Sequence, residues 1–393
     1  MICAVQVEEK GPLCENDVTL SEGPDYDGCD VFGSGPEAAE SENAWKTCEK
    51  HPGHANFIPI TEFGLNHLPE QYRTQSIKDL VNAIAVVTVK LVVRCNSPER
   101  MPRYCYSMSG ERNSAHVGSG WILDIQKGKG PCRGCFECDP NTSEMVKEPA
   151  QDKEKWYLVY VISANHVVFD SEEAKATEVQ LFYDDKKSRK DQRMKSIYGA
   201  MLERGGSSED SCVLICFTHN ERLAKELTGY VDTMKSMVLK GNRDDPLFEY
   251  EYVRKTLPEH QNGLCIMVSH PHGQPKMVTV GKREQVDRKR VQHLRRISLT
   301  ERSRRLRLKN PLFYSTESCR GSSGSPVFMP VSVETRRKDP HQFPLVDAMV
   351  IRSHSIGNVF QGVGLSSGES PLVVAPLLAL PPPLKEDGVQ KVS

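Results

Sequence analysis

The chain has 393 residues, of which 38% are hydrophobic and 26% are charged, and its formal net charge is −1. This composition is typical of a globular protein and excludes a collagen-like, a repeat-only or a wholly disordered chain. The neutral total conceals two charged segments. Residues 1–45 hold eleven acidic residues against one lysine, whereas residues 282–309 hold twelve basic residues against three acidic ones.

The first segment, residues 1–55, is rich in Gly, Pro, Ser and Glu and has neither a helical nor an alternating apolar period. We predict that it forms an acidic disordered tail. No basic residue and no long apolar stretch precede Glu8, which argues against a signal peptide, and no apolar run is long enough to span a membrane. The thirteen cysteines, an odd number in a large chain, favour reduced thiols over a disulfide scaffold. We therefore expect an intracellular protein, cytoplasmic or nuclear, without membrane contact.

Short β-branched and apolar runs dominate the middle of the chain. The first of them, residues 82–93, is predicted to be a strand. Similar runs follow at residues 120–124, 156–163, 178–183, 212–217, 264–269, 277–280, 326–328 and 345–351. A helix is predicted at residues 221–237, and the Pro-rich end, residues 376–393, is predicted to be an extended tail. Many short strands with few helices indicate an all-β sandwich or barrel.

A cysteine cluster, Cys132, Cys135 and Cys138, follows one of these runs. Its two C-x-x-C steps resemble half of a zinc site, because two intervening residues allow both thiolates to reach one metal ion. A fourth ligand would have to come from Cys95, Cys105 or a histidine. Reduced loop cysteines are the favoured interpretation, and a structural zinc is the alternative.

The strongest chemical signal is the segment Arg320-Gly-Ser-Ser-Gly-Ser-Pro-Val-Phe328. The glycines around Ser323 allow a tight turn that presents its hydroxyl and directs successive amides into one concavity. An activated serine with an oxyanion hole requires this geometry. A simple Gly/Ser turn before a strand is the alternative interpretation.

A serine nucleophile needs a base and an orienting acid elsewhere in the chain. His166 directly follows an apolar strand, and Asp210 directly precedes one. Taken alone, His166 would be interpreted as a structural histidine and Asp210 as an ordinary loop carboxylate. Asp170 and the pair Asp184 and Asp185 are rival acids. Asp210 is preferred because the apolar strand follows it immediately.

Four segments resemble the trypsin-like serine peptidases in order and spacing, most closely the HtrA/Deg branch and related intracellular members. They are Gly118-Ser-Gly-Trp-Ile122, Ser163-Ala-Asn-His-Val-Val168, Asp210-Ser-Cys-Val-Leu214 and Gly321-Ser-Ser-Gly-Ser-Pro326. The resemblance covers residues 75–375. It implies two six-stranded antiparallel β-barrels, at about residues 75–225 and 245–375, with the site in the cleft between them.

The resemblance implies a serine endopeptidase that acts on proteins or peptides and requires no cofactor. Ser323 would be the nucleophile, His166 the general base, Asp210 the orienting acid, and the amides of Gly321 and Ser323 the oxyanion hole. Glu317 occupies the position at which this family places the floor of the primary specificity pocket. A carboxylate there would favour Lys or Arg before the cleaved bond, and an exposed loop glutamate is the alternative.

Departures from the family pattern are also informative. Ser322 replaces the acid that pairs with a freed amino terminus in secreted trypsins, so activation of that kind is not expected. No cysteine follows Cys319, so the family's usual disulfide at this position cannot form. His270 and His272, in a His-Pro-His-Gly sequence, are candidate metal ligands, but the resemblance favours a structural turn.

The basic insertion, residues 282–309, is interpreted either as a solvated loop or as a binding site for nucleic acid or another anionic surface. It contains no aromatic residue, which argues against stacking on single-stranded bases. The competing function for the chain is therefore a non-catalytic peptidase-fold scaffold or a nucleic-acid-binding protein. Nothing in the sequence specifies an oligomeric state.

Overall fold

The computed structural model describes residues 30–32, 42–99, 115–130, 132, 155–204, 210–239, 263–284, 312–333, 346–353, 356–360 and 363–366. Its strands are β1 (Asp30–Phe32), β2 (Ile58–Pro59), β3 (Thr88–Val93), β4 (Ala115–Lys127), β5 (Tyr157–Ser163), β6 (Thr177–Leu181), β7 (Lys195–Arg204), β8 (Cys212–Thr218), β9 (Leu264–Ser269), β10 (Met277–Glu284), β11 (Leu312–Tyr314), β12 (Pro326–Val333), β13 (Val346–Ser353), β14 (Ile356–Phe360) and β15 (Val363–Ser366). The α-helices are α1 (Glu42–Lys46), α2 (Gln75–Val87), α3 (Ser171–Lys175), α4 (Lys187–Lys190) and α5 (Glu221–Leu239). Short 3-10 helices are η2 (Pro52–His54), η3 (Ile60–Glu62), η4 (Leu65–His67), η5 (Glu70–Tyr72) and η7 (Pro271–Gly273).

The first half of the chain forms a closed antiparallel barrel. Its six strands follow the order β4-β3-β6-β7-β8-β5, and pairing of β5 with β4 closes the ring. Strand β1 adds to β4 outside the ring. Side chains of β8 alternate between buried and partly exposed, as expected for a strand with one face toward the barrel interior. The predicted first six-stranded barrel is confirmed.

The second half forms an eight-stranded antiparallel sheet. Its path runs β13-β12-β9-β10-β11-β15-β14, and β2 pairs with β10 beside this path. Among the described residues, no strand pairing joins β13 to β14, the two ends of the path. The structure therefore shows an all-β second unit but not the second closed barrel that the resemblance implies.

Helix α2 corrects one prediction, because the run at residues 82–93 is not a single strand. Its first part completes the helix, and β3 begins only at Thr88. The side chain of Thr74 accepts a hydrogen bond from the amide of Ile77 and caps the helix. The buried side chains have a helical spacing, which outweighs the strand preference of the β-branched residues; they are Leu80, Val81, Ala83, Ile84, Ala85 and Val87.

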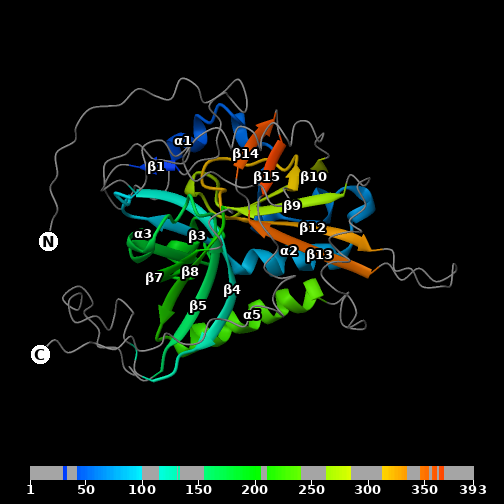
Figure 1. Ribbon diagram of the computed structural model, residues 1–393. Coiled ribbons are helices and arrows are strands. Elements are labelled where there is room, and N and C mark those ends of the chain that lie inside the picture. Colours follow the sequence, from blue (N-terminus) through cyan, green and yellow to red (C-terminus); the bar gives the residue numbers. More distant parts are fainter. Residues whose placement is uncertain are drawn as a thin grey trace, which may run out of the picture.

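Helix α5 confirms the helix predicted at residues 221–237. The side chain of Asn220 accepts a hydrogen bond from the amide of Leu223 at its start. Helix α5 contacts α2 and strands β4, β5 and β13, while α2 contacts β3 and β9. The two helices therefore lie along the boundary between the barrel and the second sheet (Figure 1).

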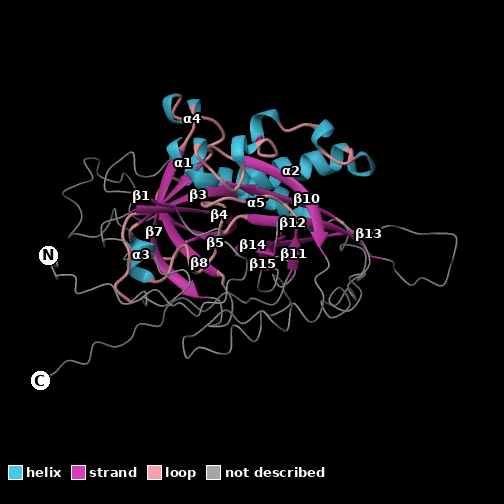
Figure 2. Ribbon diagram, turned by 90° about the horizontal axis from the view of Figure 1, so that it is seen from above, coloured by secondary structure: helices cyan, strands magenta, loops and turns pink. Residues whose placement is uncertain are grey.

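Figure 2 shows α2 and α4 on one side of the strands and α3 on the other. Within the described ranges, no helix is long and apolar enough to cross a membrane.

Residues 42–73 cover the second sheet before the barrel begins. Helix α1 contacts η7, β2 pairs with β10, and Phe63 and Leu68 are buried in the main core. Residues 42–55, which the sequence analysis assigned to the acidic tail, contribute α1 and η2 to this covering segment. Residues 285–309 of the basic insertion, the Pro-rich tail, Cys135 and Cys138 lie outside the described residues.

Candidate active site

The structure brings His166 and Asp210 together through the pairing of their strands. Strands β5 and β8 pair along their full length, with Ser163 opposite Cys212, so the loop after β5 meets the residues before β8. His166 Nδ1 lies 2.7 Å from Asp210 Oδ2, and the His166 amide donates to Asp210 Oδ1 at 3.0 Å. Both side chains are buried, at 1% and 0% exposure. This two-point contact fixes the imidazole ring and favours the proton on Nδ1, which leaves Nε2 as the basic nitrogen.

Ser323 lies in a tight turn that depends on two glycines. Gly321 has φ +87° and Gly324 has φ +84°, in the left-handed region that favours glycine. A Cβ atom on Gly324 would lie 2.2 Å from both the Ser119 carbonyl oxygen and the Ser163 hydroxyl oxygen. Ser323 itself is fully buried. The turn is thus held in one conformation against the barrel.

Ser119 of β4 joins this turn to the loop that carries His166. Its amide donates to the Ser323 carbonyl at 2.8 Å, and its hydroxyl donates to the Gly321 carbonyl at 2.8 Å. Its own carbonyl accepts the Ser163 hydroxyl at 2.8 Å. Because Ser163 lies three residues before His166, these bonds place the turn around Ser323 beside the His166 loop.

Two amides of the turn have a defined orientation. The Arg320 carbonyl accepts from the His272 amide at 2.6 Å, and the Ser322 carbonyl accepts from the Ser325 amide at 3.1 Å. No cis peptide bond occurs among the described residues, and in a trans peptide the carbonyl and the following N–H point in opposite directions. The amides of Gly321 and Ser323 therefore point away from these internal bonds.

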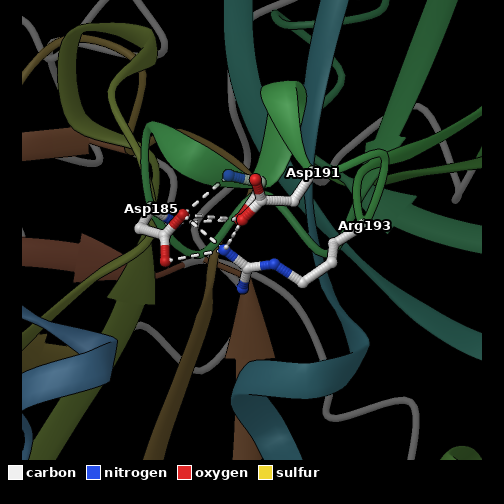
Figure 3. A network of polar contacts seen from close by, with 4 residues as sticks. Asp185, Asp191 and Arg193 are labelled. Atoms are coloured by element: carbon white, nitrogen blue, oxygen red, sulfur yellow. Dashed lines mark hydrogen bonds and ion pairs between the residues drawn. The ribbon is translucent and has the colours of Figure 1, made fainter.

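The rival acids contact other groups. Asp170 caps α3 and accepts a hydrogen bond from the Ser97 hydroxyl. Asp184 Oδ1 lies 2.7 Å from Lys276 Nζ. Asp185 binds Arg193, which also contacts Asp191 (Figure 3), and the hydrogen bond with Arg193 lowers the pKa of Asp185.

Glu317 contacts the covering segment that precedes the barrel. Its Oε1 accepts from the Asn56 side-chain amide at 2.7 Å, and its Oε2 lies 3.4 Å from His51 Nδ1. Its backbone carbonyl accepts from the Thr279 hydroxyl at 2.9 Å. The role of Glu317 in a specificity pocket stays a prediction, but its carboxylate already has two partners that the sequence motifs do not indicate.

A second group of chemically capable side chains lies next to the turn around Ser323. Cys48, His54, His272 and Cys319 bring one ligand atom each to within 4.8 Å of one another. The hydrogen bond with Cys319 lowers the pKa of Cys48 to about 4, and burial lowers the pKa of His54. Of these four residues, the sequence suggests only His272 as a metal ligand, because Cys48 and His54 lie in the predicted tail.

The other candidate ligands are separate from this group. His270 Nδ1 donates a hydrogen bond to the Gln274 carbonyl at 3.0 Å, which closes the turn predicted at this position. Burial lowers the pKa of His270 well below its ordinary value. Cys132 is half-buried and, among the described residues, belongs to no group of metal-ligating side chains.

No protein-family model and no curated protein matches the chain. Solved structures that resemble it include the inactive form of the Rv3671c protease, with 11% identity over 78% of this chain and 97% of that one and a TM-score of 0.33. They also include the HtrA-type protease AlgW with a decapeptide, with 13% identity over 77% of this chain and 66% of that one and a TM-score of 0.36. Both are proteases.

Proposed function

We propose that the chain is a serine endopeptidase that hydrolyses peptide bonds through Ser323, His166 and Asp210. The observation that carries this proposal is the buried contact of 2.7 Å between His166 Nδ1 and Asp210 Oδ2, beside a glycine-framed serine turn. A buried histidine held by a carboxylate at Nδ1 has its other nitrogen oriented for proton transfer. Structural histidines need no serine turn beside them.

In the proposed reaction, His166 Nε2 takes the proton from Ser323 Oγ as this oxygen attacks the carbonyl carbon of the peptide bond. Collapse of the tetrahedral intermediate breaks the carbon–nitrogen bond, and His166 gives its proton to the leaving amine. The acyl group then remains on Ser323 as an ester. Water attacks this ester by the same steps, and the second product leaves as a carboxylic acid while Ser323 regains its proton.

The amides of Gly321 and Ser323 are proposed to bind the oxyanion of the tetrahedral intermediate. Their orientation supports this role, because the carbonyls of Arg320 and Ser322 are held by other amides. Loss of one such donor typically lowers turnover by about 10²–10³-fold. Asp210 is proposed to hold His166 in the required tautomer and to stabilise its protonated form.

A fluorophosphonate probe tests the proposal, because it reacts only with an activated serine. We expect the folded full chain to be labelled at Ser323 and Ser323→Ala not to be labelled. Ser236→Ala provides a matched control, because Ser236 lies on α5 and its hydroxyl donates to the Thr233 carbonyl of its own helix. Circular dichroism of each variant checks the fold. Labelling of Ser323→Ala, or no labelling of folded wild type, would contradict the proposed function.

A further inference from the structure

Four metal-ligating side chains from two distant parts of the chain converge beside the turn that carries the proposed nucleophile Ser323, which we call the nucleophile turn. Cys48 and His54 come from the covering segment, whereas His272 and Cys319 come from the turns before β10 and β12. We refer to Cys48, His54, His272 and Cys319 as the Cys2His2 cluster. His54, His272 and Cys319 are buried, and Cys48 is partly buried.

The distances within the cluster match a tetrahedral zinc site. Cys48 Sγ and Cys319 Sγ lie 3.7 Å apart, and Cys319 Sγ lies 3.5 Å from His54 Nε2. Zinc–sulfur bonds of about 2.3 Å and zinc–nitrogen bonds of about 2.0–2.1 Å place tetrahedral neighbours about 3.8 Å apart for two sulfurs and about 3.6 Å for sulfur and nitrogen. The two measured distances, between the sulfurs of Cys48 and Cys319 and between Cys319 Sγ and His54 Nε2, thus match the edge lengths of a tetrahedral zinc site.

The backbone and the neighbouring rings hold the two histidines in place. His54 has φ +49° and His272 has φ +51°, a conformation that costs free energy in residues other than glycine and that often occurs at functional sites. Trp45 stacks on His54 with 3.6 Å between ring centroids and meets His272 edge-on at 6.1 Å. These contacts restrict both imidazoles before any metal binds.

The donor set also selects the kind of metal. Two thiolates and two imidazoles suit zinc, whereas magnesium and calcium prefer carboxylate and carbonyl oxygens. Four protein ligands fill a tetrahedral shell and leave no open position for water, which is typical of a structural zinc site.

We propose that the Cys2His2 cluster binds one structural zinc ion, which fastens the covering segment to the nucleophile turn. The site differs from the cysteine cluster at residues 132–138 that the sequence suggests. A disulfide between Cys48 and Cys319 is the competing chemistry, and it would use neither histidine.

The cluster lies next to the peptide unit that carries the Gly321 amide, so a bound zinc would also affect reaction at Ser323. This second inference rests on the proposed function. Cys319 immediately precedes Arg320, and the His272 amide donates to the Arg320 carbonyl. One ligand therefore lies one residue before the peptide unit that carries the Gly321 amide, and the backbone amide of a second ligand binds the carbonyl of that unit. Loss of zinc should free this peptide unit to rotate and should slow reaction at Ser323.

Elemental analysis of the full chain, purified in reducing buffer, tests the site directly. We expect about one zinc per chain in the wild type and in Ser323→Ala, and loss of zinc in Cys48→Ser. Cys95→Ser is the matched control, because Cys95 is also a partly buried cysteine but lies outside the cluster. Cys132→Ser should likewise keep its zinc. Zinc retained by Cys48→Ser, or absent from the wild type, would overturn the proposal.

Cobalt and chelation extend the test in case Cys48→Ser does not fold. Cobalt in the wild type should show the visible absorption of a tetrahedral ion with thiolate ligands, and a chelator should lower the melting temperature of the wild type. Peptide mapping without reductant that finds a Cys48–Cys319 disulfide in zinc-free, folded protein would refute the site. Normal fluorophosphonate labelling after zinc removal would refute only its link to the nucleophile turn. A zinc-loaded protein without labelling would refute the proposed function and leave the metal site standing.

Discussion

At the scale of single residues, the candidate site depends on Asp210. Its two carboxylate oxygens accept separate hydrogen bonds from the backbone and the ring of His166, so one side chain fixes both the position and the tautomer of this imidazole. None of the rival acids has this contact; each binds a cation, a helix end or a hydroxyl group instead.

We expect Asp210→Asn to lower kcat by roughly 10⁴-fold, because an amide at this position favours the tautomer with the proton on Nε2, which cannot act as the base. Peptide hydrolysis by the purified variant measures this effect. Asp185→Asn is the control, since Asp185 pairs with Arg193 at the surface, and its kcat should match that of the wild type. Activity of Asp210→Asn close to the wild-type value would assign the acid to another residue.

At the scale of secondary-structure elements, the site is formed where strands end. Strand β5 leads to His166, Asp210 leads into β8, and the turn around Ser323 leads into β12. Ser119 of β4 connects two of these places, because its hydroxyl donates to the turn around Ser323 and its carbonyl accepts from Ser163 at the end of β5. The packing of Gly324 against β4 and β5 leaves no space for a side chain.

We expect Gly324→Ala to be more destabilising than Gly130→Ala. Both glycines have φ near +80°, at +84° and +74°, so alanine at either position adds backbone strain of roughly 1–2 kcal/mol. Only Gly324 has close neighbours, and relief of that overlap should cost about 1–3 kcal/mol more. Urea unfolding of both variants measures the difference. Equal free energies of unfolding would show that the turn can move away from β4.

The sequence predicts elements and residues that local patterns define, and it fails where distant segments meet. His166, Asp210 and Ser323 are recognisable because each lies next to an apolar strand in a short motif. Cys48 and His54 lie in a polar segment with no such motif, and their partners in the cluster follow more than 200 residues later. The sequence does not reveal helix α2 for a different reason: its β-branched end continues directly into β3, so the two elements resemble one strand.

At the scale of the whole molecule, Lys276 connects the barrel, the second sheet and the covering segment. Its buried ammonium group pairs with Asp184 at 2.7 Å, and its amide donates to the Tyr183 carbonyl at 3.0 Å. Its carbonyl accepts from the Ile60 amide at 3.1 Å. Asp184 therefore stabilises the fold by pairing with the buried ammonium group of Lys276.

We expect Asp184→Asn to lower the free energy of unfolding by about 1–3 kcal/mol, because it leaves the buried ammonium of Lys276 without its carboxylate. Asp191→Asn is the control, since the pair of Asp191 and Arg193 is exposed and should contribute less than about 1 kcal/mol. Chemical denaturation compares the two variants. Similar values would mean that water or another group compensates Lys276.

The covering segment has a practical consequence for work on isolated fragments. The peptidase resemblance begins at residue 75, and a fragment that starts there would keep His166, Asp210 and Ser323. It would lose the edge strand β2, the core side chains of Phe63 and Leu68, both partners of the Glu317 carboxylate and half of the Cys2His2 cluster. Such a truncated protein would expose apolar surface and would leave the Glu317 carboxylate without Asn56 and His51. Inactivity or aggregation of such a fragment would therefore result from the loss of the covering segment and would not argue against the proposed triad.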